Sequence, residues 1–285
     1  FDPKKLRKID FLGLYLFRMT KNLDDLGLKT IATHYDIFYI DLWGVVHNGI
    51  ELHAGAINVL NKLSELKKNY VLLTNAPRPN KTVKKFLEKL GMSSEQRNHV
   101  YTSGQAALNY LTKNLKDNFF YHIGPPRDFD LFLEFKDKKK ENLGECEYLL
   151  CTGLFDDQSE DLKFYKQLLE NDIHKKMICT NPDLIVDRGN KRELCAGSIA
   201  MIFEKMGGDV MYFGNPYPEV YNQAINNKEK KILCVGDNLN TDIKGANLLN
   251  FDSLIISSGI HKKEIEDEVI DKISKIYESS PNYIQ

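Results

Sequence analysis

Two aspartates in this chain each stand where a predicted buried strand ends. Asp41 follows an apolar and aromatic run at 35–40, and Gly44 comes three positions later. Asp237 follows a second apolar run, at 232–236. In open α/β sheets, ligands bind at the carboxyl ends of the strands, because the covering helices leave a crevice there. A carboxylate at that edge can act as a nucleophile or as a metal ligand; the alternative is that Asp41 only caps the following turn.

A hydroxyl and an amide end the next predicted strand along the chain. Thr74 and Asn75 close the apolar run at 70–73, and a segment with helical spacing at 54–66 joins that run to the Asp41 strand. A strand, a helix and a strand at this spacing predict a βαβ unit, so both polar ends should face one crevice. The two side chains there could bind a phosphate oxygen, or could only start a turn.

Asp242 lies five residues after Asp237, at the predicted start of a helix. Taken alone, Asp242 would be a helix N-cap. Two carboxylates around one strand-to-helix loop also suit Mg²⁺, which takes oxygen ligands and usually keeps waters. The combination with Asp41 and Thr74 favours the metal site.

Composition points to a small-molecule ligand. The chain has 285 residues, long enough for one large domain or two moderate ones. Its 39 basic and 40 acidic residues give a formal net charge of -1, so no global field favours nucleic acid or an anionic membrane. An odd number of cysteines without a CxxC pair indicates buried thiols in a reducing compartment, rather than disulfides or a zinc site. The cysteines are Cys146, Cys151, Cys179, Cys195 and Cys234.

The first residues have only a faint similarity to a signal peptide. The apolar run at 11–17 is short, and Arg18 ends it without a small-residue cleavage site. No run approaches the roughly 20 apolar residues that span a bilayer. We therefore expect a cytoplasmic protein, in which residues 1–18 are an extension or an added remnant.

Three motifs in this order resemble the haloacid dehalogenase (HAD) superfamily of phosphohydrolases. The insertion between the second and third motifs, with 180–183 and 195–200, resembles the type IIA cap of NagD-like phosphatases. The resemblance runs from about Leu23 to Gly259. The motifs are Asp41-x-Trp43-Gly44-Val45, Leu73-Thr74-Asn75 and Gly236-Asp237-x-x-x-Thr241-Asp242.

The resemblance implies an α/β fold with a Rossmann-like parallel-sheet core and an inserted α/β cap of the C2 type. On this basis, residues 1–22 are an N-terminal extension, 23–117 and 209–285 form the core, and 118–208 form the cap. The cap would close over the site, exclude water and select the leaving group.

The resemblance also implies a mechanism. Asp41 would attack phosphorus to form an aspartyl-phosphate, which water then hydrolyses. Mg²⁺ would offset the repulsion between this carboxylate and the phosphate. The expected activity is that of a Mg²⁺-dependent phosphatase of a small phosphorylated metabolite, such as a sugar phosphate or a nucleotide. The implied residues are Asp41, the Trp43 carbonyl, Asp237 and Asp242 for the metal, and Thr74 and Asn75 for the phosphoryl oxygens.

Two departures from the family pattern bear on turnover. The family's phosphatases carry a general acid and base two residues after the nucleophile, and that position here is Trp43. Such proton transfer is typically worth about 10²–10⁴-fold. The second departure is Asn215, where the family usually has a lysine. Asn215 can donate a hydrogen bond to the phosphoryl group but brings no positive charge, a loss on the order of 10²–10³-fold.

Residues near the strand ends could compensate. His47 lies six residues after Asp41 and can titrate near neutrality, so it is a candidate for proton transfer; the alternative is an ordinary surface or packing residue. Arg78 follows Thr74 closely enough to bind phosphate from the same crevice. Trp43, the only tryptophan, forms either a wall over the site or simple packing.

Two other function classes stay open. Haloacid dehalogenases carry an aromatic residue at the position of Trp43 and need no metal, but they have a different cap and keep the lysine. A non-catalytic binding or regulatory protein would keep the fold and the metal site despite the changes at Trp43 and Asn215. The substrate is not identified: Arg188, Lys191 and Arg192 either attract an anionic tail or are simply solvated. The resemblance suggests a homodimer through the cap, which the sequence itself leaves open.

Overall fold

The computed structural model describes residues 19–188, 191–225 and 229–285. The expectation that residues 1–18 form an extension lies outside this part of the chain. Within the described residues, no helix is long and apolar enough to cross a membrane. The five cysteines all lie there too, where they are buried and form no disulfide, as predicted.

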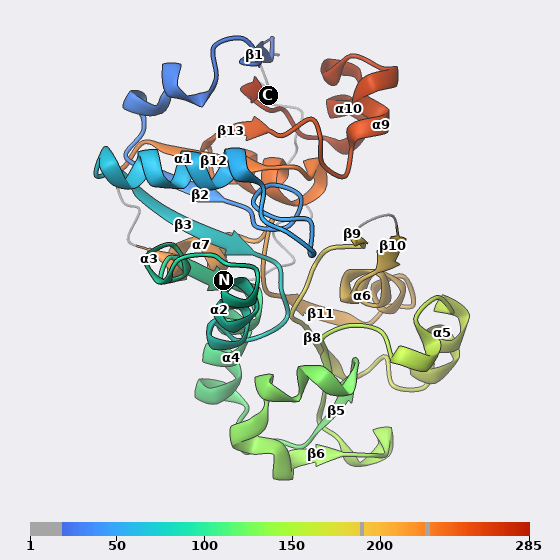
Figure 1. The fold of residues 1–285 in the computed structure, drawn as a ribbon. Helices are drawn as coiled ribbons and strands as arrows, with labels where there is room; N and C mark the ends of the chain where they lie inside the picture. The colour runs from blue at the N-terminus through green and yellow to red at the C-terminus, as the bar shows by residue number, and fades with distance from the viewer. Residues whose placement is uncertain (1–18, 189–190, 226–228) are drawn as a thin grey trace.

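The described residues form two large sheets and a two-stranded hairpin, and the larger of the two large sheets occupies the upper part of Figure 1. Its strands in the described residues are β1 (Lys21–Asn22), β2 (Ile37–Ile40), β3 (Asn69–Thr74), β4 (Val100–Thr102), β12 (Ile232–Gly236), β13 (Asp252–Ile255) and β14 (Tyr283–Ile284). They are all parallel, in the order β1-β14-β13-β12-β2-β3-β4. The central strands read as continuous apolar runs because both faces of the sheet are covered.

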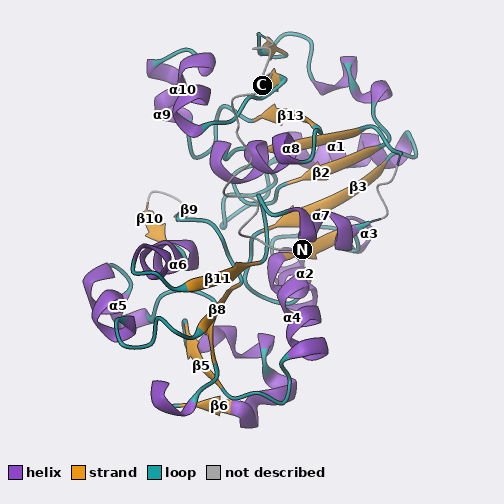
Figure 2. Cartoon of the chain, turned by 180° about the vertical axis from the view of Figure 1, so that it is seen from behind, coloured by secondary structure: helices purple, strands orange, loops and turns teal. Residues whose placement is uncertain are grey.

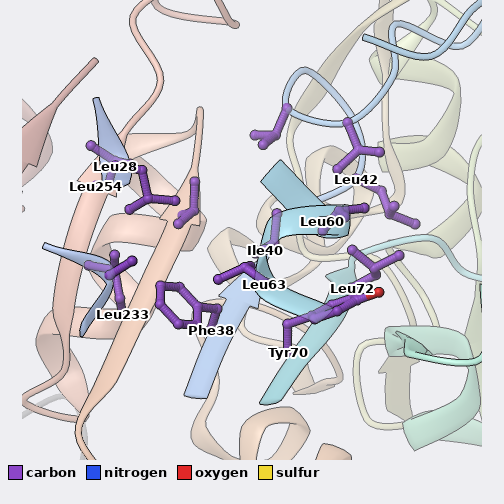
Figure 3. Close-up of a cluster of buried hydrophobic side chains, with 14 of the residues drawn as sticks. Leu28, Phe38, Ile40, Leu42, Leu60, Leu63, Tyr70, Leu72, Leu233 and Leu254 are labelled. Atoms are coloured by element: carbon purple, nitrogen blue, oxygen red, sulfur yellow. The ribbon is translucent and has the colours of Figure 1, made fainter. Parts of the chain in front are cut away.

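Helices cover each face of this sheet. Leu60 and Leu63 of one helix pack on Phe38 and Leu72, as Figure 3 shows. On the opposite face, Tyr39 of β2 packs with residues of three other helices. The helices of the first face are α1 (Ala54–Glu65) and α2 (Asn80–Lys89), and those of the second are α4 (Ser103–Asn114), α7 (Pro218–Ala224) and α8 (Lys244–Leu248).

The second sheet is also parallel, in the order β11-β8-β7-β5-β6. Two helices cover one of its faces, and the other face joins the apolar cluster beneath the larger sheet. This is the predicted α/β fold, a parallel-sheet core with an inserted α/β cap. The strands are β5 (Phe120–Ile123), β6 (Lys139–Lys140), β7 (Tyr148–Cys151), β8 (Lys176–Cys179) and β11 (Asp209–Tyr212), and the helices are α5 (Leu162–Leu169) and α6 (Ala196–Lys205).

The strand pairing differs from two of the predicted domain boundaries. Strand β11 pairs with β8, so the smaller sheet continues to Tyr212, past the cap boundary predicted at residue 208. Lys21 and Asn22 pair with the C-terminal strand β14, although residues 1–22 were predicted to be an extension. We propose that the core comprises 21–117 and 213–285, and the cap 118–212.

A hairpin from the cap reaches the core. Its strands β9 (Ile185–Arg188) and β10 (Lys191–Leu194) are antiparallel, and Figure 2 shows them between the two sheets. The Trp43 indole N–H, in the loop after β2, donates to the backbone oxygen of Asp187 at 2.6 Å. This bond ties the hairpin to the carboxyl edge of the larger sheet.

Short helices complete the described chain. The cluster of Leu239, Ile243, Ile255 and Ile273 holds the C-terminal helices against the larger sheet. The remaining α-helices are α3 (Ser94–Arg97), α9 (Lys262–Asp267) and α10 (Ile270–Tyr277); the 3₁₀ helices are η2 (Leu28–Thr30), η3 (Ala32–His34), η4 (Pro126–Leu131), η5 (Leu133–Lys138), η6 (Leu143–Glu145) and η7 (Asp156–Gln158); and η8 (Leu239–Ile243) is a π-helix.

Candidate active site

Three aspartates predicted to meet do so at the carboxyl edge of the larger sheet. Asp41 follows β2 and Asp237 follows β12, which pairs with β2 in parallel, so the two residues leave the sheet side by side. The Asp41 N–H donates to the Val235 oxygen at 2.8 Å. One carboxylate oxygen from each of Asp41, Asp237 and Asp242 lies within 4.8 Å of the others.

Glycines permit this close approach. Gly44 has a φ of +83°, and a Cβ there would lie 2.0 Å from Oδ2 of Asp237. A Cβ on Gly236 would lie 2.2 Å from the Cβ of Asp242. Any other residue at either position would displace a carboxylate, so the glycines of the two motifs shape the cluster.

The cluster is electrostatically unbalanced without a cation. Burial, and then the negative charges of neighbouring aspartates, raise the pKa of Asp41 and the pKa of Asp242 well above the usual range. Burial likewise raises the pKa of Asp237 to about 7. Oxygen ligands this close, with a surplus of negative charge, fit a hard divalent cation.

Thr74 and Asn75 lie beside the acids. Both residues line, together with the three aspartates, a cavity of about 350 Å³. The Thr74 hydroxyl accepts the Ala76 N–H at 3.3 Å. The Asn75 amide group donates to Oδ1 of Asp183 at 2.9 Å and to the Asn215 oxygen at 3.1 Å, while its Oδ1 accepts the Asn215 N–H at 2.7 Å. The Asn75 side chain therefore connects three segments of the chain.

Asn215 reaches the cluster through one aspartate. Its side chain is 3% exposed, and Nδ2 donates to Oδ1 of Asp242 at 2.8 Å. Its own Oδ1 is buried and has no hydrogen-bond partner among the described residues. Asn215 thus orients Asp242; direct contact with a phosphoryl oxygen stays a prediction.

Trp43 lines both the cavity of about 350 Å³, called the acid cavity below, and a larger one. Gly49 makes room for the Trp43 ring, because a Cβ there would come within 2.6 Å of the indole. The larger cavity, of about 660 Å³, lies between core and cap. Trp43 therefore lies where the two cavities meet, and its role as a wall over the site stays a prediction. The other residues that line both are Thr74, Asn75, Asp183 and Val186.

His47 lies in the wall of the larger cavity and is only 2% exposed. Its Nδ1 accepts the Gly49 N–H at 3.0 Å, and its ring packs edge-on against Trp43 and Phe86. Burial, with a smaller effect of His53, lowers the pKa of His47 to about 4. The ring is uncharged at neutral pH, which favours packing over the predicted proton transfer.

Arg78 also faces the larger cavity, where it is held by the cap. One guanidinium nitrogen donates to the Arg127 oxygen at 2.9 Å and to Asp130 at 3.3 Å, and Nε lies 3.6 Å from Asp128. The guanidinium thus bridges the β3–α2 loop and helix η4. A phosphate-binding role for Arg78 would require it to exchange these partners.

Sequence reasoning did not assign Asp183 a role at the site. This cap residue lines both cavities, binds Asn75, and adds its negative charge to those that raise the pKa of Asp41. Burial raises the pKa of Asp183 itself to about 6. The available signal was its position in the polar segment 180–183, directly after the apolar run that forms β8.

Comparisons with known proteins agree with this geometry. Two family models match the chain: "Haloacid dehalogenase-like hydrolase" over residues 38–135 and a HAD-hydrolase-like family over 212–280. The matched segments contain the three aspartates and Thr74. They flank most of the cap.

Relatives match over nearly the whole chain. A 5'-nucleotidase of Bacillus subtilis is 24% identical over 260 residues, covering 88% of this chain and 98% of the relative. A D-glycerol 3-phosphate phosphatase of Mycobacterium tuberculosis is 27% identical over 256 residues, covering 82% and 66%. A haloacid dehalogenase-like hydrolase from Brucella suis superimposes with a TM-score of 0.78 at 30% identity, covering 90% and 97%. A glycerol phosphate phosphatase from M. tuberculosis, solved with magnesium, gives a TM-score of 0.64 at 24% identity, covering 90% and 76%.

Proposed function

Because this chain belongs to the haloacid dehalogenase superfamily, subclass IIA (NagD-like), whose members hydrolyse phosphate monoesters, we propose that it is a Mg²⁺-dependent phosphatase of a small phosphorylated metabolite. One observation carries the proposal. The carboxylate oxygens of Asp41, Asp237 and Asp242 gather within 4.8 Å of one another beside Thr74, in a cavity that shares lining residues with a larger one.

Each residue of the site has a role in this proposal. Asp41 attacks phosphorus, the ester oxygen leaves, and water then hydrolyses the aspartyl-phosphate. Thr74 and the backbone N–H of Asn75 hold phosphoryl oxygens, and Asn215 orients Asp242. Bound Mg²⁺ would neutralise charge between nucleophile and phosphate, held by Asp41, the Trp43 carbonyl and Asp237, with Asp242 in support.

Trp43 limits the rate in this scheme. An indole cannot protonate a leaving oxygen, and the buried, uncharged His47 does not replace the missing acid. Turnover should therefore be slow for alkyl phosphates, whose leaving oxygen needs a proton. Esters of acidic alcohols, such as 4-nitrophenyl phosphate, should be hydrolysed faster.

A panel of phosphate esters, assayed with Mg²⁺ and with a chelator, tests the proposal. We expect metal-dependent phosphate release that is lost in Asp41→Asn and kept in Asp137→Asn, a change at an exposed aspartate. Absence of release from every ester would contradict catalysis. A haloacid assayed in parallel tests the dehalogenase alternative, which halide release without metal would support.

The second candidate is a non-catalytic, metal-binding regulatory protein. Two changes together favour it. Trp43 stands in the place of the general acid, and the Asn215 side chain, in the place of the lysine, donates its amide hydrogen bond to Asp242. This candidate requires Mg²⁺ binding by calorimetry together with no phosphate release. Turnover that depends on Asp41 would exclude it.

A further inference from the structure

The larger cavity is where a leaving group would lie. It adjoins the acid cavity through Trp43, Thr74 and Asp183, so an ester with its phosphate at Asp41 would extend into it. Its volume of about 660 Å³ is within the range of small-molecule sites. Residues of both core and cap line it, including Phe86 and Phe155.

The core side of this cavity is a row of rings. The His47 ring lies between Trp43, at a centroid distance of 5.1 Å, and Phe86, at 5.6 Å, with edge-on geometry at both contacts. Phe155 lines the cap side. Aromatic ligands gain about 0.5–1.5 kcal/mol per ring contact beyond simple burial. The wall therefore suits a leaving group with a ring.

The charges around the cavity do not suit an anion. Each cation that lines the cavity in the described chain has an acidic partner within 4 Å. Five acids line the cavity against three cations, a formal balance of −2. An anionic tail would have to displace an acid from its cation and remain near the others, and like-charge juxtaposition is costly. The pairs are Arg78 with Asp128 and Asp130, Arg127 with Asp156, and Lys191 with Glu160 and Glu193; Asp183 is the fifth lining acid.

We propose that this cavity selects monophosphate esters whose leaving group is uncharged and carries an aromatic ring, and that it rejects leaving groups with a carboxylate or a second phosphate. The inference rests on the proposed phosphatase function, which places the phosphate at Asp41. Lys191, which lines the cavity beside Glu160 and Glu193, is accordingly not a site for an anionic tail.

Trp43 provides a readout that needs no turnover, because it is the only tryptophan and lines the cavity. Adenosine, glycerol and glycolate serve as phosphate-free probes of metal-free protein: an uncharged ring, an uncharged polyol and an anion. We expect adenosine to change Trp43 emission in a saturable way, and glycolate to leave it unchanged at equal concentration. Stronger binding of glycolate than of adenosine would overturn the proposal.

Two variants test the ring and the charge separately. Phe86→Leu should weaken adenosine binding roughly 2- to 10-fold, whereas Phe129→Leu, at an exposed ring away from the cavity, should not. Asp156→Asn leaves Arg127 without its acid and should improve phosphoglycolate binding about threefold, as expected for an exposed ion pair. Adding Arg127→Gln should remove that gain. Circular dichroism of each variant checks the fold. Unchanged adenosine affinity in folded Phe86→Leu, or unchanged phosphoglycolate affinity in folded Asp156→Asn, would contradict the assignment.

A catalytic comparison separates this inference from the function on which it rests. With Mg²⁺, kcat/KM for adenosine 5'-monophosphate should exceed that for phosphoglycolate. A preference for phosphoglycolate would overturn the inference and leave the phosphatase proposal intact. If no ester is hydrolysed while adenosine still binds beside Trp43, the phosphatase proposal fails and the cavity's preference for an uncharged ring stands.

Discussion

At the scale of single residues, Trp43 holds the position with the largest consequence. It lines both cavities, and its indole N–H fixes the β9–β10 hairpin through Asp187. In the proposed site the metal contact uses only the backbone carbonyl at this position, so the exchange of an aspartate for tryptophan should cost proton transfer rather than metal binding. The family's usual acid has been replaced by a structural contact between core and cap.

Trp43→Asp tests this directly. An aspartate there can protonate the leaving oxygen, and we expect kcat for an alkyl phosphate to rise roughly 10- to 100-fold. Trp43→Asn is the matched control, since it loses the same indole contact without supplying a proton. Steady-state kinetics measure kcat of both variants on the alkyl phosphate. Equal kcat values for Trp43→Asp and Trp43→Asn would mean that proton transfer does not limit turnover.

At the scale of elements, Arg78 links the core to the cap. Its partners Asp128 and Asp130 lie in helix η4, and Asp128 is only 4% exposed. Burial raises the pKa of Asp128 to about 6, although Arg78 counteracts this rise. The Arg78 guanidinium therefore helps to hold the cap against the core.

Arg78→Gln should lower stability more than it lowers the chemical rate. We expect a loss of about 1–3 kcal/mol in the free energy of unfolding, as for charged hydrogen bonds, with kcat changed by less than about tenfold. Denaturant melts and kinetics measure both. Lys62→Gln, whose exposed ion pair with Glu65 lies away from both cavities, is the control and should change neither. A fall of 10²-fold or more in kcat at unchanged stability would instead support the predicted contact with phosphate.

His122 in β5 gives the cap a pH dependence. Burial, with a smaller effect of Lys139, lowers its pKa to about 3, and its Nε2 lies 2.9 Å from the Thr152 hydroxyl. The unfolded chain binds this proton near the ordinary value and the folded chain does not, so the stabilising contribution is present above about pH 6.5 and is lost as the pH falls. The slope is about 1.4 kcal/mol per pH unit.

His122→Gln should therefore flatten the decline in stability of the protein on acidification. Urea melts at several pH values between about 6.5 and 4 measure the slope. The exposed His34→Gln is the control and should behave like the parent protein. A slope in His122→Gln equal to that of the parent would contradict the account.

The elements that position the site could be predicted from the sequence, and their long-range partners could not. The runs before Asp41, Thr74 and Asp237 are continuous and apolar, which predicts buried parallel strands and hence one shared edge. Strands β1 and β14 have two residues each, and β1 pairs with β14 across the length of the chain. The partners of Arg78 depend on how the cap sits on the core, which no local pattern encodes.

At the scale of the whole molecule, the acid cluster should couple metal binding to folding. Three crowded carboxylates, of which Asp237 and Asp242 are buried, should destabilise the metal-free protein, and a cation that binds only the folded state should recover that loss. A ligand at about 100 times its dissociation constant stabilises by about 2.7 kcal/mol. The melting temperature should therefore rise with Mg²⁺ concentration.

Asp237→Asn should remove the coupling between Mg²⁺ binding and folding stability. Removing one charge relieves repulsion, so we expect this variant to melt at a higher temperature than the parent without metal, and to show little further rise with Mg²⁺. The amide can still accept the Ile260 N–H that Asp237 now accepts at 2.9 Å. Calorimetry with and without Mg²⁺ measures both effects; a full Mg²⁺ response in the variant would place the cation elsewhere.

The central claim is that Asp41 carries the phosphoryl group, and acid quenching followed by peptide mass spectrometry tests it most directly. With 4-nitrophenyl phosphate, whose leaving oxygen needs no proton, the first step should be fast; because Trp43 cannot act as the base in the second step, the aspartyl-phosphate should accumulate. The account predicts one phosphoryl group on the peptide that contains Asp41, formed only with Mg²⁺ and absent in Asp41→Asn. Phosphate release without this adduct, or an adduct on another residue, would contradict it.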